Sequence, residues 1–257
     1  MIFESHAHYD DGKFNEDRDA LLKELLDGNI CNIINIGASL ESTKASIALA
    51  QKYPQIYAAA GVHPSDVGEL DEQRLDWLKE QAAHPKVVAV GEIGLDYYWE
   101  KEDGIQKLQR FWFARQLKLA SDAKLPVVIH SREAAEDTMK VLKSVHAGEA
   151  CGVIHCYSYS PEMAKEFVRM GYYIGVGGVV TFKNAKKLKE TVIQVPLERI
   201  LLETDAPYLA PEPYRGKRNH SGYLGYVAEE VARLKGVSAE EVEEVTCKNA
   251  RRLFQVE

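Results

Sequence analysis

Short apolar runs alternate along this chain with longer segments in which apolar residues recur every three or four positions. The short runs predict strands, and the longer segments predict amphipathic helices. Strands are expected at residues 2–5, 31–36, 56–62, 87–90, 127–129, 152–154, 172–176 and 200–202. Helices are expected at residues 15–28, 40–53, 71–83, 104–124, 133–146, 161–170 and 183–193. In the helix at 104–124, an apolar stripe and a charged face are expected from Leu108, Phe111, Trp112, Leu119, Arg115 and Lys118.

This order of elements predicts a (β/α)8 TIM barrel. Strands that are joined by helical crossovers pair in parallel. Eight such units in 257 residues match the length of a (β/α)8 barrel, and an open doubly wound sheet is the alternative. Two or three further helices are expected after the last strand, at residues 225–235, 239–247 and 248–254. The chain contains no linker, repeat or charge block, so we expect a single domain over residues 1–257.

Composition and charge narrow the class of protein. Hydrophobic residues make up 46% of the chain and charged residues 28%, which is typical of a folded globular protein. The net charge of −7 excludes a broad basic surface, so a phosphate would be bound by a local basic patch or by metal. No signal peptide or membrane-spanning apolar run is recognisable. Four cysteines without a CxxC pair favour reduced thiols in a cytoplasmic protein.

Side chains that can bind metal gather where the expected strands end. In a (β/α)8 barrel, catalytic groups lie at the C-terminal ends of the strands. His6 and His8 follow the first strand, and two residues that are two apart on an extended segment point to the same side. Glu92 and Asp205 follow nearly pure apolar runs, where a carboxylate needs a partner. The side chains expected to converge as metal ligands are His6, His8, Glu92, His130, His155 and Asp205.

Six ligands exceed the number, usually about three, that a protein supplies to one catalytic metal. The set therefore predicts two divalent ions that share a bridging carboxylate, and Glu92 is the expected bridge. Ligation rich in imidazole favours zinc or another transition metal over magnesium or calcium, while magnesium and manganese stay open as activating ions. Two divalent ions beside two carboxylates leave a positive centre, which stabilises an anionic group as in two-metal phosphoryl transfer.

The same residues lie in motifs that resemble those of a known family. The motifs are SHAHYD at 5–10, GVHP at 61–64, GEIGLDYY at 91–98, PVVIHSREAAED at 126–137, IHCYS at 154–158 and LLETDAPYLAPEPYRGKRN at 201–219. Over residues 2–254 the chain resembles the TatD family of metal-dependent deoxyribonucleases, within the amidohydrolase-like barrels. The resemblance implies one metal among His6, His8, Glu92 and Asp205 and the other among Glu92, His130 and His155. It also implies an exonuclease on DNA, although related proteins include a D-aminoacyl-tRNA deacylase.

Three places depart from the family pattern. Glu4 stands where an aspartate usually precedes the S-x-H-x-H segment. Tyr159 replaces a glycine after the IHCYS motif and is expected to add bulk near the site. After RGKRN, the family continues with an acidic or amide residue and proline, whereas here the residues are His220, Ser221 and Gly222. The ligand set is intact, so these departures leave substrate preference open but not metal binding.

Several further residues are candidates for contact with substrate. His63 could hydrogen-bond a phosphate or protonate a leaving oxygen, or else structure its loop. Glu203 could orient a ligand or a water from the second shell, or be a buried hydrogen-bonded acid. Arg132 could bind an anionic substrate or lie at an ordinary helix start. Phosphate could be bound by Arg215, Lys217 and Arg218, or these residues could form an ordinary solvated loop. Unpaired bases could stack on Tyr97, Tyr98 and Trp99, or these side chains could pack within the protein.

These observations lead to a functional hypothesis with two alternatives. The first is a TatD-type exonuclease on single-stranded DNA, with RNA as a further substrate, in which hydroxide generated by two metals attacks phosphorus. Asp205 would accept the proton of water, Glu92 would bridge the metals, and His63 would contact substrate. The second is a hydrolase of carbon esters or amides, including D-aminoacyl-tRNA, which needs the same nucleophile. The third is a metal-binding scaffold without turnover. No membrane association and no obligate protein partner are expected.

Overall fold

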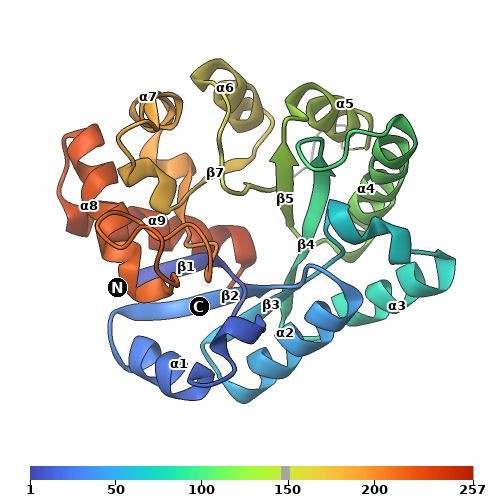
Figure 1. Cartoon of the computed structure of the whole chain (residues 1–257), viewed down its shortest axis with the longest axis horizontal. Coiled ribbons are helices and arrows are strands. Elements are labelled where there is room, and N and C mark those ends of the chain that lie inside the picture. The colour runs from blue at the N-terminus through green and yellow to red at the C-terminus, as the bar shows by residue number, and fades with distance from the viewer. Residues whose placement is uncertain (146–150, 257) are drawn as a thin grey trace.

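The computed structural model describes residues 1–145 and 151–256, and it shows a barrel of eight parallel strands surrounded by helices (Figure 1). The strands follow one another in chain order, and each pairs in parallel with the next. They are β1 Ile2–Ala7, β2 Ile30–Ile36, β3 Ile56–Ala60, β4 Val87–Asp96, β5 Val127–Arg132, β6 Gly152–Ile154, β7 Tyr173–Val176 and β8 Ile200–Leu202. Ala7 also bridges to Ala206 just after β8, so the sheet returns to its first strand. The expected (β/α)8 fold is confirmed, and the open doubly wound sheet is wrong.

A helix follows each of the first seven strands, and two helices follow the eighth (Figure 1). They are α1 Arg18–Asp27, α2 Leu40–Lys52, α3 Glu72–Ala82, α4 Asp103–Ala123, α5 Ala135–Val145, α6 Pro161–Arg169, α7 Lys186–Gln194, α8 Leu224–Lys235 and α9 Ala239–Phe254. Side-chain caps mark several starts, such as Ser160 before α6 and Ser238 before α9. Residue 146, the last one expected in the helix at 133–146, lies outside the described residues.

The C-terminal helix α9 is continuous, so the expected break between residues 247 and 248 is wrong. Its side chains Ala250, Leu253 and Phe254 pack in one cluster with an apolar residue from each of the eight strands. One such contact is the stack of Phe254 on Phe3, whose ring centroids lie 6.1 Å apart. Since Phe3 lies near the beginning of β1, α9 covers the end of the barrel opposite the strand ends that face the site.

The apolar face expected for the helix at 104–124 is partly wrong. Trp112 and Leu119 are buried, but Leu108 and Phe111 are 38% and 50% exposed. Residues 108 and 111 share a helix face with the charged positions 115 and 118, because these positions are spaced by three and four residues. The buried face of α4 instead passes through Trp112, and the exposed one carries two apolar side chains.

Strand β4 is longer than expected, and this changes the position of Glu92. The strand was expected at 87–90 with Glu92 beyond it, but it extends to Asp96 and contains Glu92. The glycines in this segment allow β4 to approach β5 closely. A Cβ atom on Gly91 would lie 2.6 Å from the Cβ of Val128, and one on Gly94, whose φ is 143°, would lie 1.9 Å from the carbonyl oxygen of His130. Within the described part of the chain, no helix is both long and apolar enough to cross a membrane.

Candidate metal centre

Backbone hydrogen bonds place Asp205 beside His6 and His8. The N–H of Asp205 donates to the carbonyl of His6 at 2.9 Å, and the N–H of His8 donates to the carbonyl of Ala206 at 2.8 Å. Asp205 adopts the left-handed conformation, with φ of 58°. These bonds connect the C-terminal ends of β1 and β8, the first and last strands of the sheet. The side chains of His6, His8 and Asp205 therefore lie close together.

His6, His8 and Asp205 form a first group of donor atoms, all within 4.8 Å of one another. The Nε2 atoms of the two histidines lie 3.1 Å apart. One oxygen of Asp205 lies 3.7 Å from Nε2 of His6 and 3.5 Å from Nε2 of His8. Two imidazole nitrogens and one carboxylate oxygen are a donor set that suits zinc and similar transition metals.

Glu92 faces this group with one oxygen and a second group with the other. Its Oε2 atom lies 3.5 Å from Nε2 of His6 and 3.6 Å from Nε2 of His8. Its Oε1 atom lies 2.8 Å from Nδ1 of His130 and 3.1 Å from Nε2 of His155. The carboxylate is buried between the two groups, which is the arrangement that a bridging ligand requires.

The hydrogen bonds behind the imidazoles leave lone pairs facing the centre. Nδ1 of His8 donates to the carbonyl of Ile36 at 3.0 Å, so Nε2 carries the lone pair of the neutral ring. Nε2 of His130 donates to Asp96 at 3.0 Å, so the neutral ring would present a lone pair at Nδ1 to Oε1 of Glu92, which lies 2.8 Å away. Without metal, a proton must lie between such a nitrogen and its carboxylate neighbour, and a metal ion can take the place of that proton. The residues present therefore fit bound metal ions.

Asp96 is a member of the centre that the sequence reasoning missed. Besides its bond to His130, its other oxygen accepts the backbone N–H groups of Tyr98 and Trp99, each at 3.0 Å. The available signal was the spacing of four residues from Glu92, which places both acids on the same face of an extended strand. The signal was lost because the strand was expected to end at residue 90.

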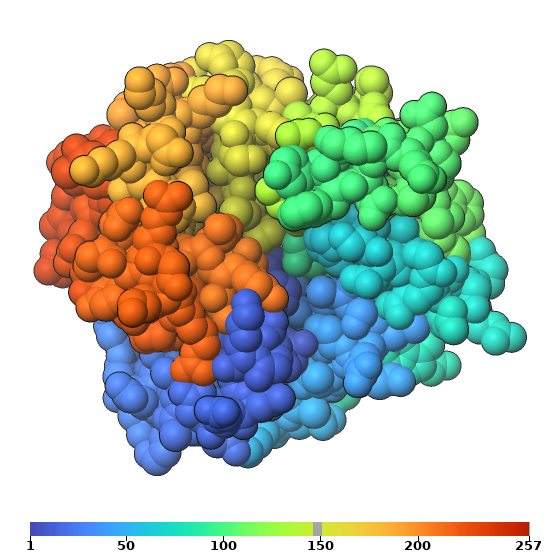
Figure 2. Space-filling model, viewed as in Figure 1, coloured from blue at the N-terminus to red at the C-terminus, as the bar shows by residue number. Residues whose placement is uncertain are grey.

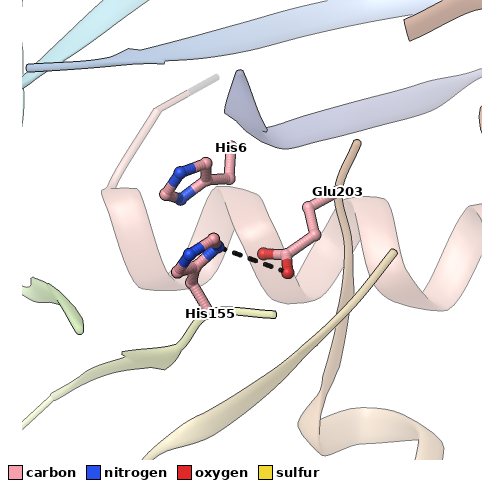
Figure 3. A group of neighbouring side chains, drawn as sticks. All are labelled: His6, His155 and Glu203. Carbon is pink, nitrogen blue, oxygen red and sulfur yellow. Dashed lines mark ion pairs between the residues drawn. The ribbon is translucent and has the colours of Figure 1, made fainter. Parts of the chain in front are cut away.

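Glu203 lies beside His155 and His6 (Figure 3). It faces Nδ1 of His155, whereas Glu92 faces Nε2 of that ring. Its Oε1 atom lies 3.6 Å from Nδ1 of His155 and accepts the N–H of Cys156. The His6 and His155 rings stack with centroids 3.8 Å apart. Nδ1 of both rings and Oε2 of Glu203 are buried without a hydrogen-bond partner. Glu203 is thus placed to orient the His155 ring, as expected of a residue that supports a ligand from behind.

The electrostatics of the group favour positive charge at its centre. Burial raises the pKa of Glu92, but the charges of His155 and His63 and the hydrogen bonds from His130 and His155 hold that pKa well below its usual value. Burial lowers the pKa of His8, but its hydrogen bond to Asp205 and the charge of Glu92 raise the pKa to about 9. Metal cations would compete with the protons that the imidazoles hold at these positions.

A cavity of about 440 Å³ opens above the centre. Figure 2 shows this face hollowed near its middle, between the blue N-terminal segment, the orange segment near residue 210 and the green segment near residue 100. Asp10, Asp11 and Tyr208 line the cavity together with the centre, and sequence reasoning had not selected these three. His63 also lines it and forms a third donor group with Glu92 and His130. His63 was expected to lie outside the ligand set.

His63 is held as a donor toward the cavity. Its Nδ1 accepts the backbone N–H of Ser65 at 3.1 Å, so the proton of the neutral ring lies on Nε2. That Nε2 lies 3.7 Å from Oε1 of Glu92. Burial and the charge of His130 lower the pKa of His63 to about 3, so the ring is neutral at pH 7.

The basic residues predicted to bind substrate differ in their surroundings. Arg132 lines a second cavity of about 270 Å³ that shares His130, His155 and Asp205 with the centre. Arg215 and Lys217 are exposed after β8, and the guanidinium of Arg215 lies 4.5 Å from the Phe182 ring centroid. The guanidinium of Arg218 is held by both carboxylate oxygens of Asp17, at 2.8 and 2.6 Å. A phosphate would have to compete with Asp17 for Arg218.

Two of the three departures from the family pattern contact each other. The Ser221 hydroxyl donates to Glu4 at 2.9 Å, and Thr204 donates to Glu4 through both its N–H and its hydroxyl. Burial raises the pKa of Glu4 to about 7. The third departure, Tyr159, was expected to add bulk near the site. Its hydroxyl instead bonds Ser131 and the N–H of Ala134 at the start of α5, and it lines neither cavity at the centre.

Comparison with known proteins identifies similar chains of full length. The family model described as TatD related DNase matches residues 3–255. An uncharacterised metal-dependent hydrolase of Bacillus subtilis, YabD, is 41% identical over 256 residues and covers 100% of both chains. The Escherichia coli hydrolase YcfH, also uncharacterised, is 34% identical over 260 residues, which are 100% of this chain and 97% of that one. The crystal structure of the E. coli TatD homologue YjjV superposes with a TM-score of 0.93 at 33% identity, covering 100% and 98% of the two chains.

Proposed function

This chain belongs to the TatD-related DNase family and is a metal-dependent hydrolase, and from that premise we propose that it hydrolyses phosphodiester bonds of single-stranded DNA with two divalent ions. The observation that carries the proposal is the position of Glu92. Its two oxygens face two separate sets of imidazoles, with His6 and His8 on one side and His130 and His155 on the other. A single ion would leave one of these sets without a partner.

The donor sets indicate which residues would hold each ion. His6, His8, Asp205 and Glu92 would hold one, and Glu92, His130 and His155 would hold the other. When bound, two divalent ions supply the positive charge that stabilises the attacking and leaving oxygens of a phosphodiester and acidify water. Zinc fits the imidazole-rich donors best, and manganese and magnesium are the activating ions to compare with it.

The chain's own side chains supply proton transfer and substrate contact. Asp205 is the carboxylate of the centre best placed to take a proton from attacking water, because its side chain is 20% exposed, against 5% for Glu92. His63 directs the N–H at Nε2 toward the cavity, where it can donate to a phosphate oxygen or to the leaving oxygen. Arg132, at the edge of the second cavity, supplies a charge for a neighbouring phosphate.

The acidic cavity wall makes the metals essential to this proposal. Asp10, Asp11 and Asp66 line the cavity beside Glu92 and Asp205, and the whole chain carries a net charge of −7. Five carboxylates repel a phosphodiester unless cations offset them. This is consistent with phosphate binding that depends on metal rather than on a basic surface.

A paired assay tests the proposal against hydrolysis of carbon esters. The metal-loaded chain is incubated with single strands labelled at the 3′ or the 5′ end and, in parallel, with D-aminoacyl-tRNA. Shortening of the DNA from one end, abolished by chelation and restored by added divalent metal, is the expected result. If the amino acid is released from the tRNA while the DNA stays intact, the nuclease proposal is wrong and the deacylase alternative replaces it.

A further inference from the structure

Large apolar side chains are exposed on the loop that follows β4. Trp99 is 66% exposed and Tyr98 is 41% exposed. Their ring centroids lie 4.8 Å apart, and the planes meet at 84°, so the two rings present different faces to solvent. Contiguous exposed apolar surface marks a site for a ligand or partner, and here the two rings are adjacent.

A cation lies against these rings. The guanidinium carbon of Arg132 is 4.0 Å from the Tyr98 ring centroid and 5.7 Å from that of Trp99. Among the described residues no carboxylate pairs with Arg132, whereas the neighbouring Lys101 is paired with Glu133 at 3.1 Å. The surface therefore combines two aromatic faces with one available positive charge.

Asp96 connects this surface to the metal centre. One of its oxygens accepts the N–H groups of Tyr98 and Trp99, and the other accepts from His130. The N–H of Tyr97 also donates to the carbonyl of Arg132 at 2.9 Å. The aromatic loop is thus fixed by one carboxylate to a histidine of the centre, and Arg132 lines a cavity that reaches the same histidine.

We propose that Tyr98, Trp99 and Arg132 form a platform on which an unpaired base of single-stranded DNA stacks next to the phosphate that is cleaved. This inference rests on the proposed function and specifies how its substrate is recognised. Aromatic rings with arginine bind successive bases and phosphates of single strands without regard to sequence. A duplex gains little from such a platform, because its bases are already stacked on one another. The platform thus selects unpaired strand ends.

Binding without cleavage tests the platform. The metal-loaded full chain is titrated with a ten-residue oligothymidylate whose phosphorothioate linkages resist hydrolysis, and with the same strand lacking its bases. Wild-type protein is expected to bind the strand with bases more tightly, with quenching of Trp99 fluorescence. Trp99→Ala and Trp99→Leu are expected to weaken that binding by roughly 5- to 100-fold and to bind both strands alike. The leucine variant keeps an apolar side chain but lacks the ring.

Phe111→Ala is the matched control. Phe111 is also a half-exposed aromatic residue with an arginine beside it, because the guanidinium of Arg115 lies 5.7 Å from its ring. Arg115 is paired with Glu72 of α3, which places this pair on the outer helices. Phe111→Ala is expected to keep the preference for the strand with bases. Equal binding of both strands by wild-type protein, or a preference that survives both Trp99 substitutions, overturns the platform.

The failure of the platform and the failure of the proposed function give different results. If the chain cleaves DNA but the Trp99 variants bind like wild type, the platform is wrong and the nuclease proposal stands. If the chain binds through Trp99 but releases no nucleotides with any divalent metal, the nuclease proposal fails and the binding platform stands.

Discussion

The Nε2 atoms of His6 and His8 lie 3.1 Å apart, and because Nδ1–H of His8 donates to the carbonyl of Ile36, Nε2 of the neutral His8 ring faces His6 as an acceptor. Without metal, His6 meets this acceptor by holding its own proton on Nε2, and a metal ion in place of that proton would be bound by both nitrogens. The pair therefore gives the metal centre a role in stability as well as in reaction.

Metal is expected to raise the melting temperature. Occupancy at 100 times the dissociation constant adds about 2.7 kcal/mol to the free energy of unfolding, and this corresponds to roughly 5–10 °C for a chain of this size. Differential scanning calorimetry of chelated protein, before and after addition of zinc or manganese, measures the shift. A melting temperature that does not respond to metal would show that the histidines and carboxylates are satisfied without it.

The carboxylate of Asp96 is expected to position His130. Replacing Asp96 with Asn leaves an acceptor but removes the charge that orients the ring, and such a change typically lowers metal affinity or activity by about 10- to 100-fold. Asp137→Asn is the control, because Asp137 accepts from Tyr97 at 2.9 Å and does not contact the centre. Equilibrium dialysis against zinc compares the two variants. Equal zinc affinities would show that Asp96 fixes the loop at Tyr98 and Trp99 but does not support the metal centre.

The basic loop after β8 is expected to act through two of its three cations. Arg215 and Lys217 are exposed, so replacing either with Ala is expected to lower the salt slope for binding of single strands by about 0.7. Arg218→Ala is expected to leave the slope unchanged, because Asp17 already holds the guanidinium. Fluorescence anisotropy of a labelled strand at several salt concentrations gives the slopes. A loop that changes no slope is an ordinary solvated segment.

The barrel could be predicted because each strand is a short apolar run in the sequence and an amphipathic helical segment follows it. The same rule located the histidines, since His8 and His155 come directly after β1 and β6. Glu92 and Asp96 show where the rule stops. Gly91 and Gly94 interrupt the apolar run of β4, and only the close approach of β5 explains why the strand continues through them. Contacts between distant segments, such as Asp17 with Arg218, leave no local pattern to read.

Glu92 faces both groups of imidazoles, one with each carboxylate oxygen. Replacing Glu92 with Gln keeps the size of the side chain but removes the charge and half of its acceptor capacity. The matched control is His84→Ala. His84 lies before β4, where its ring contacts Gln51 at 3.0 Å and the N–H of Lys86, far along the strand from the centre.

The most direct measurement is the number of metal ions per chain, which elemental analysis determines. The rate of hydrolysis of single-stranded DNA is measured on the same samples. We expect two ions for the wild type and for His84→Ala, with equal rates. We expect fewer than two ions for Glu92→Gln and a rate lower by at least about 100-fold. Two ions and an unchanged rate in Glu92→Gln would contradict the bridging role of Glu92.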